Sequence, residues 1–204
     1  DENAVMLYRI DHTTSYHYTE PVTLCHNEAH LLPRHLTRQR CLDAYLRIDP
    51  TPAVYHERKD FFGNRVVYFS IEELHSQLTV TAVSEVQLST LSPPDMAQTP
   101  PWEQVRRFVR QETSRGALEA RQFVLDSPLV AASGPWAEYA SEVFSAGRPL
   151  LLATQELMRR IYREFTYDSA FTTIATPLRE VFEHKRGVCQ DFAHLAIACI
   201  RSCG

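Results

Sequence analysis

The N-terminal half of the chain alternates apolar and polar positions with a period of two, which is the spacing of a half-buried strand. Residues 7–18, 41–49 and 76–88 all show this alternation. Gly63 and Asn64 stand between two further apolar runs, and the pair is a hairpin-turn signal because both residues tolerate a positive φ. Several strands without a convincing helix predict a small antiparallel sandwich or barrel.

The spacing of apolar residues changes to three and four after residue 101, which predicts helices. Four prolines within residues 93–101 separate the two patterns, and this stretch is interpreted as a linker because neither a helix nor a central strand tolerates it. Thr176 is a candidate N-cap, with Pro177 at the first helical position. The expected helical segments are 102–113, 135–144, 149–167, 176–184 and 188–203.

These patterns describe an α+β protein in three parts. Residues 1–92 form a β-domain, residues 93–101 the linker, and residues 102–204 a helical domain. A chain of 204 residues is long enough for this division into two small domains.

Composition and charge exclude several classes of partner. The net charge is −4 and no Lys/Arg block occurs, so we expect no nucleic-acid partner. No apolar run approaches the roughly 18 residues that cross a bilayer, so we expect no membrane partner. The five cysteines are odd in number, scattered and without a CxxC pair, which argues against a disulfide framework or a zinc ribbon. We therefore expect the protein to work in a reducing compartment, the cytoplasm. We expect no cofactor.

Cys189 is the candidate nucleophile because it opens the last expected helix. The dipole of a helix N-terminus favours the reactive thiolate, and Lys185 and Arg186 add positive charge nearby in the sequence. Backbone N–H groups at the same helix start are suited to hold an oxyanion. Gly187 lets the chain turn tightly and lets a substrate approach the backbone.

The alternative is that Cys189 is a small hydrophobe in the core, as a lone helical cysteine usually is. Two later cysteines fit that description, because they share one helix face with three other apolar residues. That face consists of Phe192, Leu195, Ala196, Cys199 and Cys203. Position and context leave both interpretations of Cys189 open.

The segment RGVCQDFAHLAIACIRSCG, with FTYDSAFTTIATPLREVFEHK before it, resembles the nucleophile helix of bacterial transglutaminase-like proteins, within the papain-like cysteine-enzyme superfamily. Weaker marks in the first half, YHYTEPV, LLPR, DFFGNRV and HSQLTVTAVSEV, follow the order of the β-domain that precedes this core in one bacterial branch. The resemblance covers almost the whole chain. It implies an N-terminal β-domain followed by the helical part of a truncated transglutaminase-like core.

The resemblance implies that Cys189 attacks an amide carbonyl and forms a thioester, which water hydrolyses or an amine accepts. Gln190 and Asp191 match the motif and are candidate supporting residues. Asp191 also lies in the first helical turn, where a carboxylate suits the helix N-terminus. In this family a histidine and an aspartate follow on later strands. The sequence has no residue after Gly204, so neither of these two roles is assigned in this chain.

Internal histidines do not fill the missing role. His194 lies about 140° around the helix from Cys189, so it is interpreted as a core or interface residue. His184 suits the negative end of the preceding helix. One expected strand carries three side chains with a spacing that metal ligands can have, but no fourth ligand can be named, and no metal is expected. These three are His26, Glu28 and His30.

Two functions follow as hypotheses. The first is a transglutaminase-like cysteine enzyme acting on a protein or peptide substrate, of which this chain is an inactive N-terminal fragment lacking about 70–100 residues of strands. The second is a protein-binding module with a degenerate enzyme core. A truncated core would leave one apolar helix face to be covered by further chain, or by a second copy in a homo-oligomer or swapped dimer. That face contains Phe192, Leu195, Ala196 and Ile200.

Overall fold

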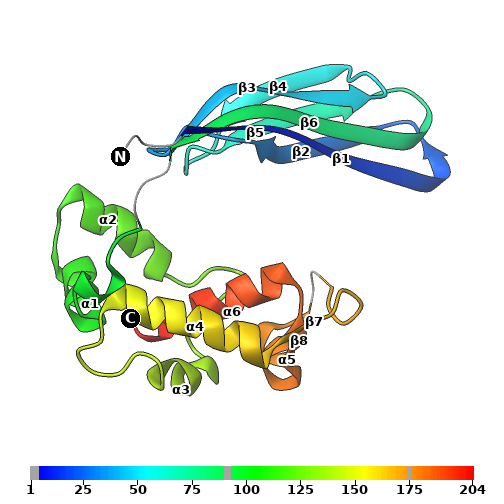
Figure 1. Ribbon diagram of the computed structural model, residues 1–204. Coiled ribbons are helices and arrows are strands. Elements are labelled where there is room, and N and C mark those ends of the chain that lie inside the picture. The colour runs from blue at the N-terminus through cyan, green and yellow to red at the C-terminus, as the bar shows by residue number, and fades with distance from the viewer. Residues whose placement is uncertain (1–4, 90–92, 174–175) are drawn as a thin grey trace. The chain divides into compact units, whose positions relative to one another are not determined.

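The computed structural model describes residues 5–89, 93–173 and 176–204 of the chain. It forms two compact units, Asp1–Pro93 and Pro94–Gly204. The first unit is built from strands and the second from helices (Figure 1). The architecture is α+β, as the hydrophobic patterns predict.

The first unit consists of two antiparallel sheets of three strands each, in the orders β1-β6-β3 and β2-β5-β4. Both central strands, β5 and β6, follow a turn and pair with a partner on each side. The strands are β1 (Val5–Val22), β2 (Cys25–Leu32), β3 (Gln39–Asp49), β4 (Val54–Lys59), β5 (Arg65–Ile71) and β6 (His75–Ser89).

The expected hairpin turn joins β4 to β5. Gly63 has a φ of 78°, and its N–H donates to the carbonyl of Asp60 at 3.0 Å. The carboxylate of Asp60 accepts from both the backbone and the side-chain amide of Asn64 at 2.8 Å. The turn therefore has the positive φ and the local side-chain bonds that Gly-Asn predicts.

The core of the first unit lies between the two sheets. It combines apolar side chains from β5, such as Phe69 and Ile71, with side chains from β6, such as Leu78. This is the packing of a sandwich. The apolar face expected along residues 7–18 is largely exposed at Tyr8 and Ile10, although β1 is paired to β6 over this length.

The second unit contains helices and one very short parallel pair of strands. No helix in the described ranges is both long enough and apolar enough to cross a membrane. The elements are η1 (Met96–Gln98), α1 (Trp102–Gln111), α2 (Arg115–Arg121), η2 (Gln122–Val124), α3 (Trp136–Ser141), α4 (Leu150–Glu164), β7 (Thr166–Tyr167), α5 (Leu178–His184), β8 (Arg186–Gly187) and α6 (Cys189–Ser202).

The stretch predicted as a linker belongs to the second unit from Pro94 onward. The carboxylate of Asp95 accepts from the N–H of Ala97 and caps η1. Thr99 Oγ1 accepts from the N–H of Leu151 at 3.2 Å, at the start of α4. Regular structure in this stretch is limited to the short helix η1, and these hydrogen bonds tie the stretch to the helical unit.

Helix α5 begins one residue later than predicted, with Pro177 rather than Thr176 at the N-cap. Thr176 Oγ1 instead accepts from the N–H of Thr173 at 2.9 Å. The segment predicted as one helix over residues 149–167 ends at Glu164, with Phe165 at its C-cap and Tyr167 in β7.

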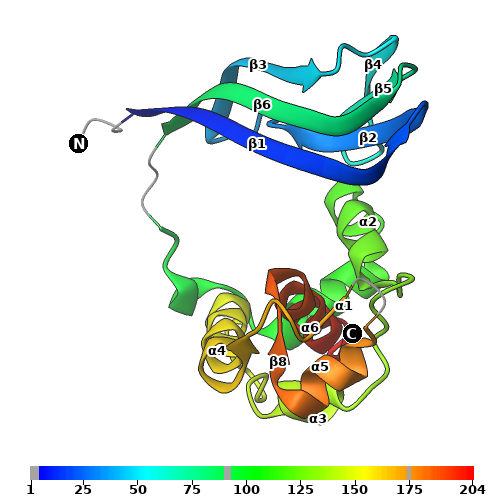
Figure 2. The same cartoon turned by 90° about the vertical axis from the view of Figure 1, so that its right-hand side faces the viewer.

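Helix α6 packs against α3, α4 and α5 and forms the centre of the second unit (Figure 2). Leu195 and Cys199 are fully buried, together with Leu157 of α4. The α6 face that the sequence predicts to be exposed is therefore only partly exposed. Leu195 on this face is buried, whereas Ile200 is exposed.

Candidate active site

The polypeptide reaches Cys189 through the parallel pair β7–β8. Thr166 N–H donates to the carbonyl of Lys185 at 2.8 Å, and Asp168 N–H donates to the carbonyl of Gly187 at 2.9 Å. A Cβ added at Gly187 would lie 2.8 Å from Asp191 Oδ2 and 3.2 Å from Val181 Cγ1. The position therefore requires glycine because of the close approach of Asp191, and not because of a tight turn.

Cys189 is the first residue of α6, and its thiol is free and exposed. A side chain at this position lies beside backbone N–H groups that have no partner within the helix. These groups and the helix dipole favour negative charge near the sulfur and on an oxyanion beside it. The structure thus places the candidate nucleophile at the surface, where a substrate can reach it.

Asp191 is buried, with an exposed fraction of 8%, at the third position of the same helix. Its Oδ2 accepts two hydrogen bonds of 2.8 Å, from the N–H of Val188 and from the hydroxyl of Thr172. Val188 has no side-chain acceptor, so Asp191 supplies one half of a capping box alone. One carboxylate thereby fixes both the residue before Cys189 and the loop that carries Thr172.

Gln190 is exposed and borders two cavities. The larger cavity has a volume of about 370 Å³. It is also lined by Asp191 and His194 of α6, by Leu178 at the start of α5, and by Leu129 in the loop before α3. Its volume lies within the range of small-molecule sites, about 300–1,000 Å³. The smaller, of about 210 Å³, lies against Thr172, Thr173 and Val188. Both cavities therefore border the residue that follows Cys189.

The two cations near Cys189 in the sequence have other partners in the structure. Arg186 Nη1 lies 3.7 Å from Asp168 Oδ2. Lys185 Nζ lies 3.6 Å from Glu164 Oε2 and faces aromatic rings. Lys185 therefore has structural partners of its own, besides the positive charge that it adds near Cys189 in the sequence. At the thiol itself, the helix N-terminus is a source of positive potential.

The internal histidines lie in other surroundings. The ring of His184, at the end of α5, packs against Phe171 with 5.4 Å between centroids. His194 lines the larger cavity beside Gln190. The three side chains considered as metal ligands lie on the outward face of β2, where His26 shares a 2.8 Å hydrogen bond with Tyr68 and Glu28 pairs with Arg58. None of these contacts supplies an imidazole to Cys189.

Cys199 of α6 and Cys203, which directly follows that helix, differ from Cys189 in their surroundings. Cys199 is fully buried, and this burial raises the pKa of its thiol to about 12. Burial also raises the pKa of Cys203, whose Sγ donates to the carbonyl of Cys199 at 3.4 Å. Both thiols stay protonated at neutral pH, so they behave as the core residues that their helix face predicts.

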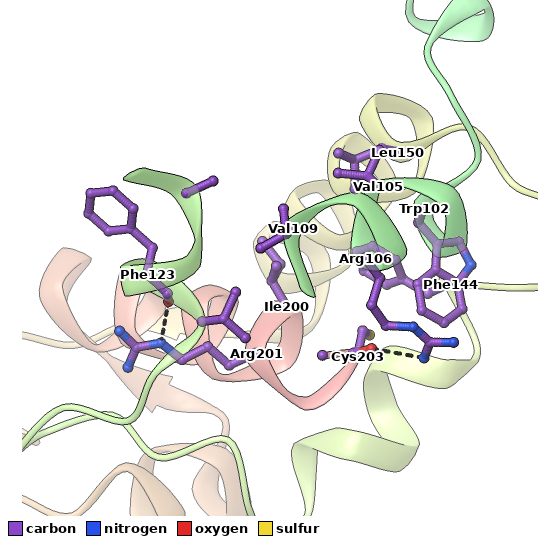
Figure 3. A pocket seen from close by; sticks show the side chains of 13 residues that line it. Trp102, Val105, Arg106, Val109, Phe123, Phe144, Leu150, Ile200, Arg201 and Cys203 are labelled. Carbon is purple, nitrogen blue, oxygen red and sulfur yellow. Dashed lines mark hydrogen bonds between the residues drawn. The ribbon is translucent and has the colours of Figure 1, made fainter. Parts of the chain in front are cut away.

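A separate apolar cavity of about 230 Å³ lies at the opposite end of α6 (Figure 3). Trp102 and Val109 of α1 line it together with Ile200. Arg106 Nη1 donates to the carbonyl of Cys203 at 3.2 Å, and Arg201 Nε donates to that of Phe123 at 2.9 Å. Because α6 has 14 residues and rises about 1.5 Å per residue, this cavity is remote from Cys189.

Comparison with known proteins identifies the family that this fold and this helix define. Residues 8–87 match the family model of the bacterial transglutaminase-like N-terminal region. Residues 137–204 match the model of the transglutaminase-like superfamily. The chain belongs to the bacterial transglutaminase-like family.

Relatives and a solved structure match nearly the whole chain. Uncharacterized protein Rv2569c of Mycobacterium tuberculosis is 41% identical over 197 residues, which cover 97% of this chain and 62% of that protein. Uncharacterized protein ML0607 of Mycobacterium leprae is 30% identical, covering 96% of this chain and 67% of that protein. The structure of "a Putative Cysteine Protease from Cytophaga hutchinsonii" has a similar fold, with a TM-score of 0.74 and 20% identity, covering 98% of this chain and 64% of that one. The chain thus spans less than two thirds of the M. tuberculosis relative.

Iodoacetamide near neutral pH should alkylate Cys189 at least about 100-fold faster than Cys199, because only the former is exposed and the latter is held protonated by burial. Cys41, which is half-buried in the first unit, is the internal control for an ordinary thiol. Mass spectrometry of the digested chain measures the rate at each site. Equal, slow labelling of all three would show that Cys189 is not activated.

The Thr172–Asp191 hydrogen bond should contribute about 1.5–3 kcal/mol to the unfolding free energy, because its acceptor is a buried carboxylate. We expect Thr172→Val to lower the stability by this amount in denaturant unfolding. The matched control is Thr173→Val, whose hydroxyl makes only a 3.4 Å exposed contact and whose loss should cost less than about 0.5 kcal/mol. Equal effects of the two variants would contradict the role of Asp191.

Proposed function

We propose that this chain carries the nucleophile of a cysteine enzyme that acts on peptide amide bonds, by hydrolysis or by transfer of the acyl group to an amine. The observation that carries the proposal is the free, exposed thiol of Cys189 at the first position of a central helix whose inward face is buried. Family membership supports the same chemistry. The substrate would be a peptide or protein, and the cavity beside Gln190 has the volume for one of its side chains.

In the proposed reaction, Cys189 Sγ attacks the amide carbonyl carbon. A C–S bond forms while the carbonyl oxygen becomes an oxyanion beside the N–H groups at the start of α6. The C–N bond then breaks, the amine leaves with a proton, and a thioester remains. Water or a second amine attacks the thioester, releases the acyl group and regenerates the thiol.

The general acid and base are proposed to lie outside this chain. The described residues provide no hydrogen-bonding imidazole for Cys189, whereas family members place a histidine and an aspartate on strands after this helix. The relatives from M. tuberculosis and M. leprae are longer than the chain. We therefore propose that the natural protein is also longer and that the remaining part supplies both residues. The free cysteines support a reducing compartment such as the cytoplasm.

A non-catalytic binding module is the second candidate. It is favoured by the same missing partner, because in the described part of the chain no histidine contacts the Cys189 thiol. In this case the first unit would be a recognition surface for another protein. A homo-oligomer or swapped dimer that covers the exposed side of α6 would be compatible with either function.

The 204-residue chain is expected to show no thiol-dependent turnover of a peptide amide, because a cysteine without its base loses most of its rate. The longer natural protein should turn over the same substrate, and Cys189→Ala should reduce the rate by at least about 10³-fold. Release of ammonia or amine measures both. The control is Cys203→Ala, which removes the thiol at the other end of the same helix, just after its last residue.

Two outcomes would contradict the proposal. If the longer protein retained its activity with Cys189→Ala, the nucleophile would be another residue. If the 204-residue chain itself turned over the substrate and lost this activity with Cys189→Ala, the base would lie within the chain.

A further inference from the structure

Lys185 occupies a backbone position that normally belongs to glycine. It follows the last residue of α5 with φ 55° and ψ 34°, in the left-handed region. Among the described residues it is the one non-glycine residue with a positive φ. Glycine is preferred at such helix ends because a Cβ is unfavourable there. A lysine at this position therefore indicates that its side chain compensates for the backbone conformation.

The Lys185 ammonium lies in a cage of three aromatic rings. Its Nζ is 4.7 Å from the ring centroid of Tyr139, 4.5 Å from that of Phe165 and 4.4 Å from that of Phe182. All three distances fall within the range of cation–π attraction, which is stronger when the cation is partly desolvated. Glu164 Oε2, at 3.6 Å, adds an opposite charge.

The cage is formed by parts of the chain that are far apart in the sequence. Tyr139 comes from α3, Phe165 follows the last residue of α4, and Phe182 comes from α5. The rings of Tyr139 and Phe182 meet edge to face at 5.6 Å, and that of Phe165 packs on Phe192 of α6 at 5.9 Å. The cage is thus part of the core around α6, and it holds the Lys185 side chain against that core.

The backbone of Lys185 leads directly to the nucleophile. Its carbonyl accepts the hydrogen bond from Thr166 that begins the β7–β8 pair, and only three residues separate it from Cys189. A change in the left-handed turn would rotate this carbonyl and shift β8 against β7. It would also move the N–H groups at the start of α6 relative to the loop that Asp191 holds.

We propose that Lys185 is a positioning residue for Cys189. Its caged ammonium locks the left-handed turn, and the locked turn sets the register of β8 and the placement of Cys189 and its neighbouring N–H groups. The inference rests on the proposed function of Cys189 as nucleophile. It differs from simple electrostatic activation, because the ammonium is engaged by the rings and by Glu164.

The experiment compares Lys185→Gly with Lys185→Arg in the 204-residue chain. Glycine permits the same φ but removes the caged cation, whereas arginine keeps a cation that can stack on the rings. Two quantities are measured: the rate of iodoacetamide alkylation at Cys189, near neutral and at alkaline pH, and amide hydrogen exchange over residues 186–191. The control is Arg186→Ala, which removes the neighbouring charge without touching the cage.

We expect Lys185→Gly to lower the alkylation rate near neutral pH by about tenfold, with a smaller loss at alkaline pH, where thiolate formation no longer limits the rate. Amide exchange over residues 186–191 should become at least about tenfold faster, since the turn is no longer locked. In Lys185→Arg, the alkylation rate and the exchange rate should both stay within about twofold of those of the original chain. Arg186→Ala should leave both within about twofold of the original chain.

Unchanged alkylation and exchange in Lys185→Gly would overturn the inference, as would an equal loss in Arg186→Ala, which would indicate a charge effect. If circular dichroism shows that Lys185→Gly does not fold, Lys185→Met, which fills the cage without charge, is tested by the same two measurements. If Cys189 in the original chain reacts no faster than Cys41, the proposed function fails. The exchange data then still decide whether Lys185 locks the turn.

Discussion

The arrangement around the candidate nucleophile depends on one buried carboxylate. Asp191 accepts from the N–H of Val188 and from the hydroxyl of Thr172, so a single side chain joins the start of α6 to the loop before α5. Position 187 requires glycine because Asp191 occupies the space where a Cβ would lie. The sequence Gly-Val-Cys-Gln-Asp is thus one packing unit, in which glycine and aspartate position the cysteine between them.

Burial distinguishes the two cysteines of α6, Cys189 and Cys199. Helix α6 is enclosed by α3, α4 and α5, and its inward face holds Cys199 in an apolar environment that raises its pKa. The first residue of the same helix lies outside this enclosure, so Cys189 is exposed, whereas Leu195, Ala198 and Cys199 are fully buried. A fixed helix with a reactive first residue is a suitable support for nucleophilic chemistry, because the geometry of attack is set before the substrate arrives.

Periodicity predicted the strands and helices where local spacing determines them, as in β6, α1 and α6. The Cys189 motif likewise led to the candidate nucleophile from sequence. Neither periodicity nor a local motif predicts contacts between segments that are far apart in the sequence. The cage around Lys185 joins three separate elements, and the sequence alone suggested only that this lysine adds charge near the sulfur. The exposure of β1 and the attachment of Asp95 and Thr99 to the helical unit also depend on tertiary packing.

The most direct test of the account is to locate the acyl group during the reaction. The longer natural protein would be mixed with a peptide amide substrate, quenched in acid, digested and analysed by mass spectrometry. The account predicts that the acyl mass is found on the peptide containing Cys189 and is removed by hydroxylamine, as a thioester requires. Product formation with this peptide unmodified, or with the acyl group on another residue, would contradict the assignment of Cys189 as the nucleophile.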